Sequence, residues 1–156
     1  VGGSGKLLRK QHSNNSRVEI GGEIVAKGIS PKTQQPWKIA IDDPREESQS
    51  RFIKTLSLED QALASSGNYR KYRMDPNTGE RYVHSINPIT GSAYKSNILS
   101  TSVKAPNCMT ADAWATALMV MPIEEGRALV EEIPHIEALW ATAEGNDFSI
   151  LTSKNW

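Results

Sequence analysis

The chain has 156 residues, a length typical of one domain with a sizeable core. Its 18 basic and 18 acidic side chains cancel, which excludes the basic surplus by which most nucleic-acid-binding domains are recognised. Cys108 is the only cysteine, so no internal disulfide forms. The longest apolar stretch, residues 113–123, is far shorter than the roughly 20 residues of a membrane-spanning helix, and we expect a soluble globular protein.

The N-terminal segment is rich in glycine and reads as a linker. Residues 1–6 resemble a phosphate-binding loop only superficially, because the spacing differs and Leu7 follows Lys6 where that motif needs Ser or Thr. Residues 7–11 suit the last turn or two of a helix. We therefore assign 1–16 to a linker or residual N-terminal segment, and 17–156 to the domain.

The next part of the chain is dominated by strand patterns. Residues 18–20 and 23–26 form an extended run interrupted by Gly21-Gly22, which indicates a bulge or a close approach of backbone or ligand. Alternating patterns predict further strands over 37–41, 52–58 and 98–104. Turn residues at 75–80 and 143–146 predict two hairpins, one of 69–74 with 81–86 and one of 137–142 with 147–152.

Helices are predicted only late in the chain. Thr110 is the expected N-cap of a helix over 111–121, with Asp112 in its first turn, where the helix dipole favours a carboxylate. Pro122 begins a second helix over 123–133, whose apolar stripe is Leu129, Val130 and Ile133. Many antiparallel strands with segregated helices predict the α+β class, with an antiparallel sheet.

Asp112 and Thr116 form a candidate cation site. Four residues apart on a helix, they share one face, and a carboxylate with a hydroxyl suits Mg²⁺, which takes few protein ligands and keeps waters or phosphates. The alternative is structural: Asp112 serves the helix dipole, and Thr116 bonds back to the carbonyl of residue 112. The residues alone leave both open.

Two further polar clusters are candidate functional sites. Residues 66–70, Ser-Gly-Asn-Tyr-Arg, combine a small backbone, a hydroxyl and an arginine fork, which suits a nucleotide loop or an ordinary turn. His84 stands near a strand end before the Asn87-Pro88 turn, where it is either a surface histidine or a proton-transfer group. Three tryptophans, Trp37, Trp114 and Trp140, are expected in the core or an interface rather than against a flavin.

The order of these clusters along the chain is similar to that in a known protein family. Residues 18–28, 64–70, 84–91 and 110–117 together resemble the C-terminal half of the ApbE-type FAD:protein FMN transferases, over about 17–152. The resemblance implies an ApbE-like α+β domain with His84 as catalytic residue and Asp112 and Thr116 as metal ligands. The cofactor-binding residues that it implies are Ser66, Gly67, Tyr69, Arg70, Thr90, Gly21, Gly22 and Glu23.

The resemblance also implies the reaction. A member of this family uses Mg²⁺ to transfer FMN from FAD to a Thr or Ser hydroxyl of an acceptor flavoprotein, releasing AMP. The acceptor is often a subunit of a membrane redox complex. The implied location is the bacterial cell envelope on its periplasmic side, with a lipid anchor in the full-length protein.

Two departures from the family pattern keep alternatives open. Asn87 stands where the family usually has Asp. If that Asp orients the histidine, Asn87 would weaken catalysis. If the residue only closes the turn before Pro88, Asn serves as well as Asp. An upstream motif resembling Asp-Leu-Gly-x-x-Ala-Lys-Gly is absent. The alternatives are a Mg²⁺-dependent FAD pyrophosphatase and a non-catalytic FAD-binding or structural fragment of the same fold.

Overall fold

A computed structural model describes residues 2–10, 14–45, 50–67, 72–74, 81–83, 91, 97–144 and 147–156. The helices are α1 (Gly2–Lys10), α2 (Cys108–Leu118) and α3 (Ile123–Glu132). The strands are β1 (Ser16–Ile20), β2 (Glu23–Lys27), β3 (Ile29–Ser30), β4 (Gln35–Asp42), β5 (Phe52–Leu58), β6 (Ala62–Gly67), β7 (Tyr72–Met74), β8 (Arg81–Val83), β9 (Ile98–Ala105), β10 (Glu137–Glu144) and β11 (Asp147–Thr152). None of the described helices is long and apolar enough to cross a membrane.

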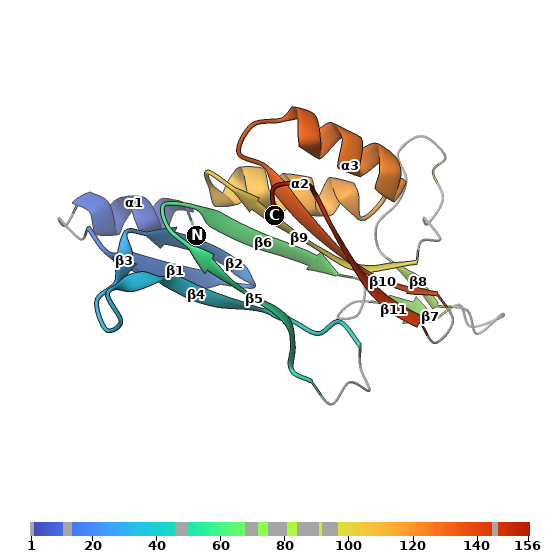
Figure 1. Cartoon of the computed structure of the whole chain (residues 1–156), viewed down its shortest axis with the longest axis horizontal. Helices are drawn as coiled ribbons and strands as arrows, with labels where there is room; N and C mark the ends of the chain where they lie inside the picture. The colour runs from blue at the N-terminus through green and yellow to red at the C-terminus, as the bar shows by residue number, and fades with distance from the viewer. Residues whose placement is uncertain are drawn as a thin grey trace.

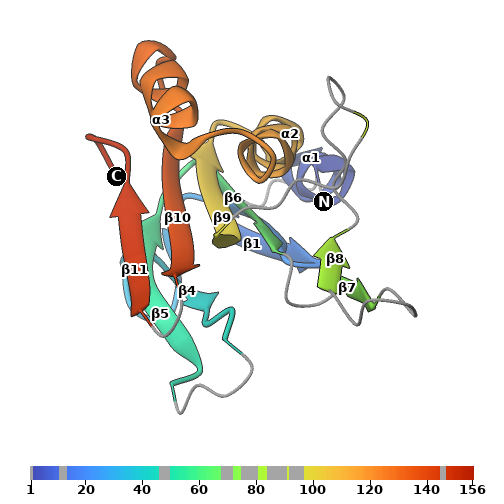
Figure 2. The same cartoon turned by 90° about the vertical axis from the view of Figure 1, so that its right-hand side faces the viewer.

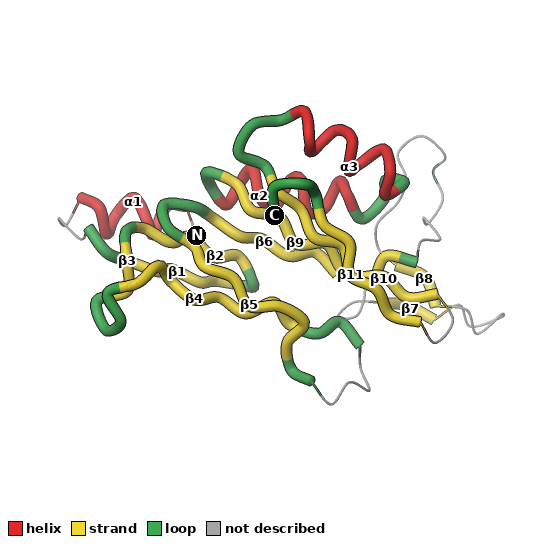
Figure 3. The backbone as a smooth tube through the Cα atoms, in the orientation of Figure 1, coloured by secondary structure: helices red, strands yellow, loops and turns green. Residues whose placement is uncertain are grey.

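The main sheet has six strands in the order β1-β2-β6-β9-β10-β11, and every neighbouring pair is antiparallel. A second sheet of three strands, β3-β4-β5, lies against one of its faces, and the three helices lie on the other (Figures 1 and 3). Figure 2 shows the helices together above the strands. The predicted α+β class with an antiparallel sheet is thus confirmed.

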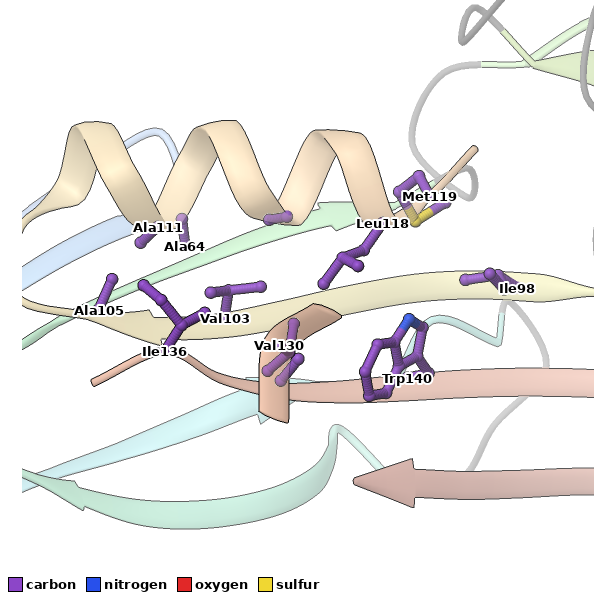
Figure 4. Packing of buried hydrophobic residues seen from close by; sticks show 12 residues of the cluster. Ala64, Ile98, Val103, Ala105, Ala111, Leu118, Met119, Val130, Ile136 and Trp140 are labelled. Carbon is purple, nitrogen blue, oxygen red and sulfur yellow. The ribbon is translucent and has the colours of Figure 1, made fainter. Parts of the chain in front are cut away.

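The larger core lies between the helices and the main sheet. Ala111, Ala115 and Leu118 of α2 are fully buried against β6 and β9, and Val130 of α3 packs near Trp140 of β10 (Figure 4). The small residues on α2 let the helix approach the sheet closely. Trp140 is fully buried in this core, as the sequence predicts.

A second core fills the opposite face. Ile39, Ile41 and Leu58 of the three-stranded sheet meet Ile24, Ala26, Leu63 and Leu139 of the main sheet. Side chains alternate along a strand. The neighbours of these residues in β2 and β6, such as Val25 and Ala64, therefore point to the helices. Gly5 of α1 confirms this direction, since a Cβ there would lie 3.3 Å from Val25 Cγ1.

Most predicted elements are present, but four local predictions are wrong. Residues 2–6 lie in helix α1 rather than in a flexible linker. Gly21 and Gly22, with φ of 65° and 92°, form the two-residue turn of a β1–β2 hairpin, which contradicts the predicted bulge and leaves the predicted close approach of a ligand as a prediction. The N-cap of α2 is Asn107, whose side chain accepts from the Thr110 amide, so Asp112 lies beyond the first turn. Leu129 is 41% exposed and does not belong to the buried stripe of α3.

The fifth difference concerns β6, which the sequence reading missed. Residues 62–67, Ala-Leu-Ala-Ser-Ser-Gly, are small and polar and resemble a turn, yet they pair with both β2 and β9 in the middle of the main sheet. The small side chains are accommodated because α2 covers this strand on one side. Ser66 and Gly67 are therefore the end of a central strand, not a free loop.

Candidate functional site

The candidate site lies where the end of β6 meets α2. Ser66 Oγ is 3.2 Å from Thr116 Oγ1, and either hydroxyl is able to donate. Ser66 is a predicted cofactor-binding residue, and Thr116 is a predicted metal ligand from a different segment of the sequence. The fold brings these two predicted residues into direct contact.

Helix α2 holds its polar face in place through its buried face. Ala111 and Ala115 are fully buried, whereas Asp112 and Thr116, one position further along in each case, are exposed. Residues four apart on a helix lie on the same side, so the Asp112 carboxylate and the Thr116 hydroxyl are neighbours. The Thr116 hydroxyl contacts Ser66 Oγ, in place of the predicted alternative in which it bonds back along its own helix.

Two carboxylates lie near the first turn of α2. The buried Cys108 thiol donates to the Ile24 carbonyl at 3.4 Å. Burial raises the pKa of Cys108, and the charges of Glu23 and Asp112 raise it further. Glu23 and Asp112 are therefore both close enough to Cys108 to affect its ionisation, on the side of the sheet that the helices cover.

The donor set around α2 fits Mg²⁺. Asp112 offers a carboxylate and Thr116 a hydroxyl, the hard oxygen ligands that this ion prefers, and their exposure leaves room for waters or phosphate oxygens. Among the described residues there is no group of three His, Cys, Asp or Glu side chains able to hold a metal ion. A site with few protein ligands, as Mg²⁺ takes in phosphate-binding enzymes, is the type compatible with this face.

The remaining predicted cofactor residues divide between the two faces of the sheet. Gly21, Gly22 and Gly67 line a pocket on the face opposite to α2, whereas Ser66 and Glu23 point to the helix side. Four predicted site residues, Tyr69, Arg70, His84 and Thr90, lie outside the described residues, as does Asn87.

The pocket contains serines that sequence reasoning missed. Ser65 Oγ lies 2.7 Å from Ser102 Oγ, and Ser100 stands two residues before Ser102 on β9. Ser65 and Ser66 point to opposite faces because they are consecutive in a strand. The only available signal was the pair of serines at 100 and 102, which period-two alternation places on one face unless a bulge intervenes.

The comparisons with known proteins point to one family. The model of the ApbE family matches residues 3–140. The FAD:protein FMN transferase of Vibrio cholerae is 42% identical over 124 residues, which cover 80% of this chain and 36% of that protein. The transferase of Haemophilus influenzae is 36% identical over 125 residues, covering 80% of this chain and 35% of the relative.

Solved structures give the same assignment. The flavin transferase ApbE from Vibrio cholerae superposes with a TM-score of 0.80 at 37% identity, over 96% of this chain and 46% of that one. The ApbE protein of Thermotoga maritima superposes with a TM-score of 0.75 at 30% identity, over 95% of this chain and 45% of that structure. The chain thus spans less than half the length of these relatives. The match of the family model over most of its residues and the shared fold show that the chain belongs to the ApbE family.

Proposed function

We propose that this chain provides part of the catalytic site of an FAD:protein FMN transferase, with Mg²⁺ bound at Asp112 and Thr116. The observation that carries the proposal is the contact of the Ser66 and Thr116 hydroxyls, with Asp112 one helical turn before Thr116 on α2. Two relatives, from Vibrio cholerae and Haemophilus influenzae, bear the name FAD:protein FMN transferase, which supports the choice of FAD as substrate.

The proposed reaction is attack at phosphorus. A P–O bond of the FAD pyrophosphate breaks, a new P–O bond forms between the FMN phosphorus and a Thr or Ser hydroxyl of the acceptor, and AMP leaves. Mg²⁺ would neutralise charge on the pyrophosphate, since positioning and charge neutralisation supply most of the catalysis in phosphoryl transfer.

Each residue of the α2 face has a role in this proposal. Asp112 and Thr116 would hold the cation, and the Ser66 hydroxyl fixes the direction of the Thr116 oxygen. His84 is proposed to accept the proton of the attacking hydroxyl, the role for which imidazole is suited near neutral pH. Tyr69, Arg70 and Thr90 are proposed to contact the flavin nucleotide on the strength of the family resemblance.

The partner and location are proposed on the same basis. The acceptor would be a flavoprotein subunit of a membrane redox complex, and the site of action the periplasmic side of a bacterial cell envelope, with a lipid anchor on the full-length protein.

The test is a product analysis. The chain is incubated with FAD, MgCl₂ and an acceptor peptide carrying one threonine, and the peptide and nucleotides are followed by mass spectrometry and chromatography. The proposal predicts AMP together with FMN-labelled peptide. Asp112→Asn should lower the rate by about 100-fold or more, because a group that neutralises charge in the transition state is lost.

A matched control is Asp147→Asn, which removes an exposed carboxylate on β11, away from α2. It should leave the rate unchanged. AMP with free FMN and an unlabelled peptide would instead assign FAD hydrolysis. FAD turnover that Asp112→Asn leaves unchanged would contradict the proposed role of Asp112.

A further inference from the structure

Thr101 lies behind the proposed cation site, in the middle of β9. It is fully buried, and in the register of β6 with β9 it lies directly opposite Ser66. Directly opposite residues of neighbouring strands point to the same face of a sheet. The Ser66 hydroxyl contacts the Thr116 hydroxyl at 3.2 Å, and the Thr101 hydroxyl donates to the sulfur of Met119 at 3.3 Å. Both strands therefore reach α2 through a hydroxyl.

The two contacts hold the same end of the helix. Thr116 lies in the last turn of α2, and Met119 is its C-cap, 2% exposed and directly after the helix (Figure 4). Residues three apart on a helix lie on the same side. A shift of Met119 along β9 would therefore carry the Thr116 oxygen with it.

The apolar packing of α2 constrains this position less. Ala111, Ala115 and Leu118 meet the sheet in the larger core through apolar contacts. Such contacts have no preferred direction, whereas a hydrogen bond has a preferred distance and angle. The hydroxyl contacts therefore determine most closely where the last turn lies along the strands.

The Thr101 hydroxyl is a poor choice for stability alone. Valine has almost the same shape, and a thioether sulfur is only a weak hydrogen-bond acceptor. Burying a hydroxyl costs free energy, which a weak hydrogen bond returns only in part. Valine at this position would therefore make the fold at least as stable. What the hydroxyl adds is the direction of its bond to Met119.

We infer that Thr101 is a positioning residue for the proposed cation site: through Met119, its hydroxyl sets where the last turn of α2, and with it the Thr116 oxygen, lies. The inference rests on the proposed function for the identity of the ligands, Mg²⁺ and FAD. Thr101 is fully buried, so it acts through Met119 and Thr116 rather than on a ligand directly.

Two substitutions separate positioning from packing. Thr101→Val keeps the shape and removes the hydroxyl, whereas Thr101→Ser keeps the hydroxyl and removes a methyl group. A positioning role predicts that only the valine variant impairs the site. A packing role predicts the reverse, because serine leaves a cavity. Thr142→Val is the matched control, since Thr142 is 5% exposed and its hydroxyl donates to the Ser149 carbonyl of β11 at 3.4 Å.

The first readout is amide hydrogen exchange, which requires no ligand. The Met119 amide donates to the Thr116 and Ala117 carbonyls, and the Val120 amide donates to the Ala117 carbonyl at 3.1 Å. In Thr101→Val both amides should exchange about threefold faster or more, because the turn opens more often, while the melting temperature is not lowered. In Thr101→Ser and in the control, both exchange rates should match those of the wild type.

The second readout is the Mg²⁺ concentration that half-saturates the Mg²⁺-dependent part of FAD binding, measured by calorimetry. Thr101→Val should raise this concentration about threefold or more, because groups that orient a metal ligand affect metal affinity. Thr101→Ser and Thr142→Val should leave it unchanged. FAD affinity without Mg²⁺ should be the same in all variants, a difference between the two conditions that a general loss of structure would not produce.

Unchanged exchange of the Met119 and Val120 amides in Thr101→Val would overturn the inference, and so would a larger change in Thr101→Ser than in Thr101→Val. An unchanged Mg²⁺ requirement in Thr101→Val, in a wild type that responds to Mg²⁺, would overturn it as well. If FAD binding by the wild type does not respond to Mg²⁺, the proposed cation site is wrong, and the exchange rates alone decide whether Thr101 holds the turn.

Discussion

Ser66 and Thr116 are 50 residues apart in the chain, yet their hydroxyl oxygens lie 3.2 Å apart. Ser66 belongs to the last two residues of β6, and Thr116 to the last turn of α2. Buried Ala64, Ala111 and Ala115 close the space between strand and helix. The contact thus couples a predicted nucleotide residue to a predicted metal ligand through a packed, rigid part of the fold.

Removing the Ser66 hydroxyl tests this coupling. Ser66→Ala should weaken Mg²⁺-dependent FAD binding by about three- to tenfold, because the Thr116 oxygen loses the hydrogen bond that fixes its direction. Calorimetry with and without Mg²⁺ measures the effect. Ser57→Ala, an exposed serine on β5, is the control. Equal FAD affinity of Ser66→Ala and the wild type in Mg²⁺ would rule out a positioning role for Ser66.

The packing of α2 on the sheet is tested by a pair of leucines. Leu118 is fully buried, whereas Leu129 on α3 is 41% exposed. Leu118→Ala should lower the free energy of unfolding by about 2–5 kcal/mol, because it leaves a cavity in the larger core. Leu129→Ala should cost less than about 1 kcal/mol. Urea denaturation of both variants gives the comparison, and similar losses would contradict the assigned core.

The Cys108 thiol should be unreactive in the folded protein. Burial and the nearby Glu23 and Asp112 charges raise its pKa, so it stays protonated at neutral and mildly alkaline pH. A colorimetric thiol reagent at pH 8 should therefore react slowly with the native chain and rapidly after denaturation.

The same raised pKa predicts how stability depends on pH. In the unfolded chain the thiol ionises at a lower pH than in the folded chain, so its contribution to stability is fully present below the unfolded pKa and is lost as pH rises from there. Cys108→Ala should make the alkaline decline of the melting temperature shallower. An equally steep decline in the variant would show that the thiol is not its source.

The β1–β2 turn gives a test of backbone geometry. Gly21 and Gly22 both have positive φ, as a two-residue type I′ turn requires. Gly22→Val should lower the melting temperature, since a β-branched residue is strained at φ of 92°. Gly21→Asn should be tolerated, because Asn-Gly is a favoured sequence for this turn. Thermal denaturation of both variants distinguishes them, and equal effects would contradict the turn type.

Strands with regular alternation were the easiest part of the fold to predict. β5 occupies the predicted residues 52–58, and β4 and β9 extend their predicted strands by one to three residues. In β4 the side chains alternate between a core and a more exposed side, whereas β9 is buried on both faces. Pro122 likewise marked the start of α3 correctly, since proline suits the beginning of a helix.

The central strand β6 could not be found in this way. Its Ala-Leu-Ala-Ser-Ser-Gly sequence lacks β-branched and aromatic residues, and what makes it a strand is pairing with β2 and β9, which are distant in sequence.

The start of α2 was misplaced because the sequence offers two candidate N-caps. Asn107 and Thr110 are both good caps, and only the observed Asn107 side-chain bond decides between them.

The candidate site was predictable in its residue types but not in its arrangement. The spacing of Asp112 and Thr116 was enough to place them on one helix face. Their meeting with Ser66, and the burial of Ser100 behind the same sheet, depend on strand order and on which face each side chain takes.

FAD titration by calorimetry shows whether the face of α2 holds a nucleotide together with a cation. The chain and Asp112→Ala are each titrated with and without Mg²⁺, with Asp147→Asn as control. We expect binding that Mg²⁺ strengthens in the wild type and in the control, and that is lost in Asp112→Ala. FAD affinity that is the same with and without Mg²⁺, or unaffected by Asp112→Ala, would contradict it.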